Sequence, residues 1–162
     1  VVAFIPILAT QRGLANPGLF YTTFAVAMLL VRSKAGEISD RRGRAIVILP
    51  GMLLAAVAMG IFGLTTGPTG VLIGAAILGL AFGSVQPALM ALTTDRVPPE
   101  ERGKAMGTFY TAWELGIAAG AAGSGWLLNL TDFGTLFLVA TAAPFAGAFL
   151  ALRARVSRKE TI

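Results

Sequence analysis

The chain has 162 residues, of which 56% are hydrophobic and 13% charged, whereas about 25% of residues are charged in an average soluble domain. A soluble domain of this length leaves about a third of its chain's surface in water and needs polar residues to cover it, which argues against that class. The chain has no Cys and no His, which excludes disulfides, Ser-His-Asp catalysis and ordinary zinc sites. We expect no metal and no cofactor, and we expect no enzymatic activity because the loops are too short to hold a catalytic domain.

Long uncharged segments predict an all-α polytopic membrane protein with six membrane helices. A helix crosses the hydrocarbon core, about 30 Å thick, with about 20 apolar residues, because each residue adds about 1.5 Å. The uncharged run 45–94 is interrupted only by the turn composition of 65–70, so it predicts two helices. The predicted segments, in chain order, are 1–11 (a helix truncated at its start), 13–31, the two sides of 45–94, 105–131 and 133–152.

The basic residues predict the orientation in the membrane. All Lys and Arg except Arg12 fall in a loop at about 32–45, a loop at about 95–104 and a tail at about 153–162. Lys and Arg accumulate in cytoplasmic loops, so these loops and the C-terminus are predicted to be cytoplasmic, with the protein in the plasma (cell inner) membrane. The net charge of +5 therefore indicates orientation and contact with the anionic lipid bilayer, and no nucleic-acid partner.

The first of these loops carries the most specific motif of the chain, Gly36-Glu37-Ile38-Ser39-Asp40-Arg41-Arg42-Gly43-Arg44. Gly43 permits a tight turn, and Asp40 can accept hydrogen bonds at a helix N-terminus. The motif resembles the signature loop of the major facilitator superfamily, G-x-L-[SA]-D-R-x-G-R-[RK]. The resemblance implies a latch that closes two halves of a transporter on the cytoplasmic face, formed by Gly36, Asp40, Arg41, Gly43 and Arg44. The alternative is a solvated basic loop without a latch.

Further resemblance favours the C-terminal half of the family's twelve-helix fold, helices seven to twelve. Residues 98–107 look like its P-x-E-x-R-G-x-A-x-G helix entry, and 116–125 resemble a degenerate form of its Gly-rich antiporter motif, with Ala121 in place of Pro. The fourth predicted helix lacks the Arg that the family's fourth helix usually carries. The resemblance thus implies a six-helix bundle over 1–162 that rocks against a missing N-terminal half.

Glu114 is the one acidic residue predicted to lie deep in the membrane. It follows Lys104 by ten positions, which places it about 15 Å into the bilayer. A carboxylate there is unfavourable unless it is paired, faces water or is protonated. Two interpretations stay open: Glu114 carries the proton that is coupled to transport, or it is a structural acid that packs its helix against a neighbour.

A substrate cavity is predicted on the first and fourth segments, because the resemblance implies that the seventh and tenth helices line it, with aromatic residues from flanking helices. Met and aromatic side chains form adaptable apolar surfaces that suit varied amphiphilic substrates. The candidates, each of which can equally serve packing or interfacial anchoring, are Phe4, Gln11, Gln86, Met90, Tyr110 and Trp113. Pro87 is predicted to kink its helix, and the spacing of Gly116 and Gly120 predicts close helix packing.

These features predict a secondary transporter that works by alternating access and couples efflux of a small organic solute or drug to H+ by antiport. The first alternative is proton-coupled uptake of a sugar or metabolite. The second is a non-transporting membrane scaffold or sensor. The expected partners are the small-molecule substrate, H+, the missing N-terminal half and the lipid bilayer.

Overall fold

The computed structural model describes residues 2–156, with side chains as far as residue 152. Every element in that range is helical, which confirms the all-α prediction. The elements are the 3-10 turns η1 (Val2–Phe4) and η2 (Pro99–Glu101) and the helices α1 (Ile5–Gln11), α2 (Gly18–Arg42), α3 (Ala45–Leu64), α4 (Pro68–Thr94), α5 (Arg102–Leu128), α6 (Phe133–Ala140) and α7 (Ala142–Val156). Of the predicted tail, residues 157–162 lie outside the described residues.

Three stretches within residues 2–152 are long and apolar enough to cross a membrane, namely Ala45–Leu64, Pro68–Thr94 and Phe133–Leu152. They correspond to α3, α4 and the pair α6–α7. The helices α2 and α5 have 25 and 27 residues, so their length also suffices to span the hydrocarbon core. Charged residues at the end of α2, and Gly, Thr and Glu114 in α5, make these two helices less apolar.

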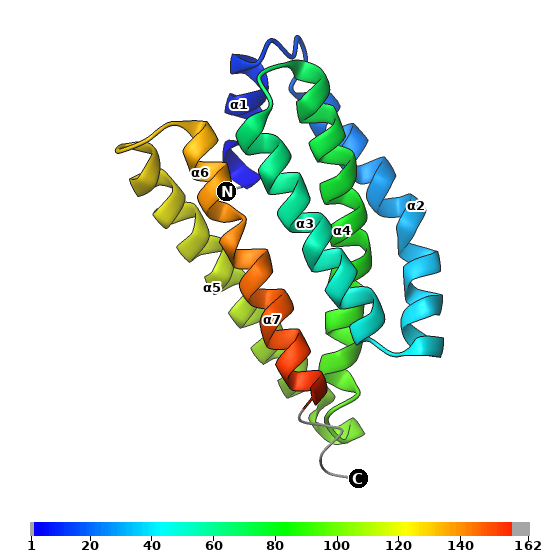
Figure 1. Cartoon of the computed structure of the whole chain (residues 1–162). Helices are drawn as coiled ribbons and strands as arrows, with labels where there is room; N and C mark the ends of the chain where they lie inside the picture. Colours follow the sequence, from blue (N-terminus) through cyan, green and yellow to red (C-terminus); the bar gives the residue numbers. More distant parts are fainter. Residues whose placement is uncertain (1, 157–162) are drawn as a thin grey trace.

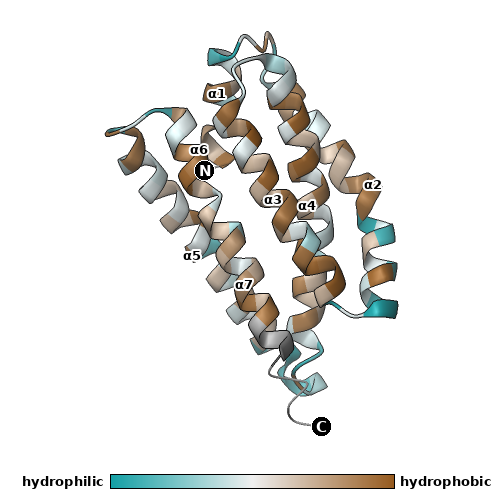
Figure 2. Ribbon diagram, in the orientation of Figure 1, coloured by the Kyte–Doolittle hydropathy of each residue, from teal (hydrophilic) through white to brown (hydrophobic). Residues whose placement is uncertain are grey.

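The long helices run up and down in one bundle, so that their connections collect at its two ends (Figure 1). One end holds the α2–α3 connection, the α4–α5 connection and the last turn of α7. We call it the basic end, because the predicted basic loops lie there. The most hydrophilic parts of the ribbon are at the ends of the bundle, and apolar residues dominate its middle (Figure 2).

Two segments differ from the predicted elements. The loop predicted at 32–45 is mostly helix, because α2 continues to Arg42 and only Gly43 and Arg44 precede α3. Long basic side chains reach water while their backbone stays helical, so charge alone does not mark the end of a membrane helix. The segment 133–152 is divided at Thr141. Pro144 explains the break, since it cannot donate to the carbonyl of Ala140, the last residue of α6.

The core lies between α2, α3 and α4, and α5 stays outside it. Three phenylalanines from α2, α3 and α6 are fully buried at its centre, and their rings form a continuous series, with Phe62 lying 6.1 Å from Phe20 and 5.4 Å from Phe137. In contrast, Ser124 is the one buried residue of α5. One side of α5 is therefore uncovered by the described chain.

Glycines of α4 permit the close approach of α2. A Cβ added to Gly79 would overlap the backbone oxygen of Phe24, and one added to Gly83 would lie 2.5 Å from the backbone oxygen of Met28. Both obstacles are backbone atoms, which cannot move aside as the end of a side chain can. The spacing of these two glycines thus serves helix packing.

We expect Gly79→Ala to lower the midpoint of thermal unfolding of the intact protein in detergent by about 5 °C, because overpacking costs about 1–3 kcal/mol. The matched control is Gly60→Ala in α3, where an added Cβ has no atom within 4 Å. Alanine stabilises an open helical site by roughly 0.5–1 kcal/mol relative to glycine, so the control should unfold at an equal or higher temperature. Equal midpoints for the two variants would contradict the packing assigned to Gly79.

Candidate functional site

The contact between α4 and α5 brings together four of the predicted cavity residues. Gln86 and Met90 lie one turn apart on α4, and Tyr110 and Trp113 lie one turn apart on α5. The Tyr110 hydroxyl donates to the Met90 Sδ at 3.9 Å. The indole of Trp113 meets the ring of Phe82 edge-on, with the ring centres 6.1 Å apart. Side chains of opposite helices thus form one mixed aromatic and thioether surface.

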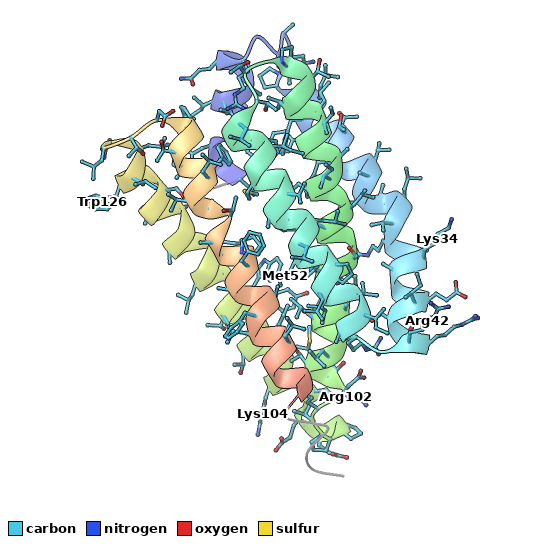
Figure 3. The ribbon with its side chains drawn as sticks, viewed as in Figure 1. Lys34, Arg42, Met52, Arg102, Lys104 and Trp126 are labelled. Carbon is cyan, nitrogen blue, oxygen red and sulfur yellow. The ribbon has the colours of Figure 1, made fainter. Side chains whose placement is uncertain are left out.

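Gln86 and Trp113 line the same cavity, which has a volume of about 280 Å³. Its wall is otherwise apolar, and Met52 of α3 lies in it between α3 and α7 (Figure 3). Pro144, which breaks the last membrane segment, also lines it. The remaining lining residues are Ala55, Ala81, Phe82, Val85, Leu89, Ala143 and Gly147. An amide and an indole N–H in an apolar wall can orient an amphiphilic organic molecule.

The other two predicted cavity residues lie elsewhere. Phe4 is half-buried and approaches the far end of α5, where its ring lies 3.8 Å from a Cβ added to Gly125. Gln11 is exposed at the last residue of α1. Neither lines the cavity described above. Pro87 lies inside α4, and the helix continues through it without a break.

Glu114 lies on the exposed side of α5, one turn beyond Tyr110. A Cβ added to Gly116 or Gly120 would have no atom within 4 Å. Within residues 2–152, no hydrogen bond or ion pair reaches the Glu114 carboxylate. The described residues thus supply no packing partner for these two glycines and no hydrogen-bond or ion-pair partner for Glu114.

Arg44 connects three helices at the basic end. Its Nε donates to Asp95 Oδ2 at 2.9 Å, and its Nη1 donates to Ser39 Oγ at 3.3 Å and to Asp40 Oδ1. Ser39 and Asp40 belong to the end of α2, and Asp95 is the C-cap residue of α4. Arg44 itself occupies the N-cap position of α3. The Arg44 side chain is 21% exposed, and its hydrogen bonds to Asp95 and Asp40 raise the pKa of the guanidinium.

The other residues of the motif differ in backbone conformation, burial and pairing partner. Gly43 ends α2 with φ of 97°, a left-handed conformation that favours glycine. Asp40 can act as an acceptor at a helix N-terminus, but it does not cap α3 and pairs with Arg44 instead. Arg41 pairs with Glu37 at 2.9 Å on the surface of α2, and Gly36 is half-buried inside α2.

Asp95 is the site residue that the sequence analysis missed. It follows α4 directly, in the second predicted basic-end loop, and its carboxylate bonds to the first loop through Arg44. The available signal was an acidic residue beside Arg96 on the same predicted side of the membrane as the motif. Periodicity within one helix cannot show that this residue faces a helix junction 51 positions earlier in the chain.

Arg12 joins two helices at the opposite end of the bundle. Its Nη2 donates to the Phe62 carbonyl at 2.6 Å and its Nη1 to Thr65 Oγ1 at 3.1 Å. A cation at a helix C-terminus is favourable, and partial burial lowers the pKa of Arg12. Within residues 2–152, no group of three or more Asp and Glu side chains is placed to hold a metal ion.

Comparison with known proteins gives concordant matches. The Major Facilitator Superfamily profile matches residues 1–162. An uncharacterized MFS-type transporter of Salmonella typhimurium is 30% identical over 146 residues, which cover 90% of this chain and 38% of the relative. The multidrug resistance protein MdtG of Klebsiella pneumoniae is 27% identical over 90% of this chain and 37% of its own length. The quinolone resistance protein NorA of Staphylococcus aureus is 22% identical over 81% of this chain and 34% of its own.

Proposed function

Because the chain belongs to the Major Facilitator Superfamily, we propose that it is the C-terminal half of a transporter that exports small amphiphilic organic solutes in exchange for protons. The chain matches less than two fifths of the length of the relatives compared above, which fits one half of a transporter. Relatives named as multidrug and quinolone resistance proteins support efflux of organic solutes. Alternating access would move this bundle against a second bundle around a central site.

The observation that carries the proposal is the cavity between α3, α4, α5 and α7. Its wall combines apolar side chains with the amide of Gln86 and the indole of Trp113, whereas charged residues are absent from its lining. An uncharged, largely apolar wall suits a molecule with a substantial apolar surface, and the flexible Met52 adapts to different shapes. A sugar, by contrast, needs several convergent hydrogen-bonding groups to replace its lost water.

The uncovered side of α5 supports a role for Glu114 at the junction of two halves. Glu114 is exposed on α5, and a Cβ added to Gly116 or Gly120, on another side of the same helix, would have no atom within 4 Å. A second bundle that packs against the Glu114 side of α5 would cover the carboxylate. A carboxyl group between two moving halves can alternate between a hydrated and a dehydrated environment. It can thereby bind and release a proton.

We further propose that the protein lies in the bacterial inner membrane with the basic end in the cytoplasm, following the positive-inside rule. Arg44 then acts as part of a cytoplasmic latch. It holds the ends of α2, α3 and α4 in one arrangement through Asp40, Ser39 and Asp95. An arginine that can exchange these acceptors for others on a second bundle provides two discrete states.

Accumulation of a lipophilic cationic dye in cells tests the direction and the cavity. Cells that make the intact transporter should hold several-fold less dye than cells without it, and Trp113→Ala should abolish most of that difference by removing the indole from the cavity. Trp126→Ala is the matched control, because Trp126 is 68% exposed near the far end of α5 (Figure 3). Higher dye content in transporter-producing cells would favour uptake, and equal content would favour a scaffold.

A further inference from the structure

A second groove lies on the surface of α2 at the basic end. It has a volume of about 360 Å³ and is lined by Lys34, Glu37, Ile38, Arg41 and Arg42. Residues spaced by three, four, seven and eight positions share one face of a helix. Lys34 and Arg42 project from α2 away from the bundle (Figure 3). This face is distinct from the packed side of α2, on which Ala27, Ala35 and Ser39 are buried.

Two of the basic groups in the groove are available for an external anion. The Arg41 guanidinium pairs with Glu37 at 2.9 Å. Among residues 2–152, no carboxylate lies within ion-pair distance of Lys34 or Arg42. The groove therefore has a net positive charge, because it holds three basic residues and one acid.

An exposed apolar row continues from the groove toward the middle of α2. Val26 and Leu30 precede Lys34 at intervals of four residues, and they are 50% and 70% exposed. Ile38, which lines the groove, continues the same row. Figure 2 shows the change along α2, from hydrophilic residues near the basic end to apolar ones farther along. One face thus offers an anion site and an adjoining apolar track.

We propose that this face binds one anionic phospholipid, with its phosphate at Lys34 and Arg42 and an acyl chain along Leu30 and Val26. Lys34 lies eight residues, about 12 Å, from the helix end at Arg42, so its ammonium would contact the phosphate by extending its long side chain along the helix toward Arg42. A guanidinium forms paired hydrogen bonds with phosphate oxygens. A free phosphate ion would bind the two basic groups but would not cover the apolar row.

The net positive charge of the groove, at the basic end of α2, predicts that the groove binds anionic lipid in preference to zwitterionic lipid. A basic residue in direct contact with the bound headgroup adds attraction for anionic lipid, about a fivefold change in affinity per residue at room temperature, whereas a basic residue outside the groove does not hold that lipid. The test uses the intact transporter in nanodiscs of mixed phosphatidylglycerol and phosphatidylcholine, with the retained lipids counted by native mass spectrometry. We expect enrichment of phosphatidylglycerol in the wild type, and a loss of at least about fivefold of it in Lys34→Gln/Arg42→Gln.

The matched control is Arg32→Gln/Arg96→Gln, which removes two basic residues of the same end that do not line the groove. It should keep the wild-type enrichment. The proposal is overturned if the groove variant keeps the enrichment, if the control loses as much, or if millimolar inorganic phosphate displaces the phosphatidylglycerol from the wild type. The phosphate arm needs no substitution, so it decides between lipid and free anion even if a variant is poorly produced.

Discussion

Glu114→Gln is expected to abolish proton-driven accumulation of solute by the intact transporter, while leaving passive equilibration of the solute across the membrane. Glutamine has nearly the shape of glutamate but cannot take up or release a proton. The carboxylate has no hydrogen-bond or ion-pair partner within residues 2–152, and Glu114 is exposed on α5. Under the proposed mechanism, a group in that position would exchange a proton between the two faces as the halves move.

The measurement is the ratio of internal to external labelled solute in proteoliposomes with an imposed pH gradient. In the wild type the ratio should exceed one by severalfold, and in Glu114→Gln it should fall to about one, which is simple equilibration. Glu101→Gln, the same change in η2 at the basic end, is the control and should keep the wild-type ratio. A Glu114→Gln protein with undiminished accumulation would assign Glu114 to the structural interpretation instead.

Arg44→Gln is expected to reduce the transport rate by at least about tenfold. Loss of a charged hydrogen-bond donor costs about 1.5–3 kcal/mol, and a difference of 1.4 kcal/mol corresponds to about tenfold. The substitution also leaves Asp40 and Asp95 near each other without the cation that separates them. The ends of α2, α3 and α4 would then lose their common connection, and the latched state would be less populated.

A double-substitution cycle distinguishes this coupling from general damage. The Arg44→Gln/Asp95→Asn protein should be less impaired than the sum of its two single variants, because the double variant removes the repulsion between the carboxylates of Asp40 and Asp95 that Arg44→Gln alone leaves. Arg32→Gln, on the exposed surface of α2, should transport at the wild-type rate. If the effects of the Arg44 and Asp95 substitutions simply add, the two residues are not coupled and the latch assignment fails.

The parts of the fold that depend on local pattern were predictable from the sequence. The uncharged run 45–94 with its central turn composition appears as α3 and α4, and Gly43 adopts the turn conformation expected of it. The end of α2 was not predictable from charge, because the stems of Lys and Arg bring the charge to water from a helix that continues. The break at Thr141 follows from Pro144, but a proline also lies in α4 without a break, so neighbouring contacts decide the outcome.

The residues of the candidate site could be predicted from the sequence, but their spatial arrangement could not. Gln86 and Trp113 were both expected at a cavity, and their common cavity depends on how far α5 stands from α3 and α7. Phe4 and Gln11 were expected on the same basis, yet the short α1 places them elsewhere. The pairing of Arg44 with Asp95 joins positions that only tertiary packing brings together.

The proposal of proton-coupled export is tested most directly by following protons and solute at the same time. The intact transporter is reconstituted into vesicles that contain a pH-sensitive dye, and solute is added outside in the absence of a pH gradient. Antiport predicts that the lumen becomes alkaline as solute enters, because each entering solute drives protons out, and this sign holds for either orientation of the protein. Acidification of the lumen would show symport, and solute entry without any pH change would show uncoupled transport; either result would contradict the account.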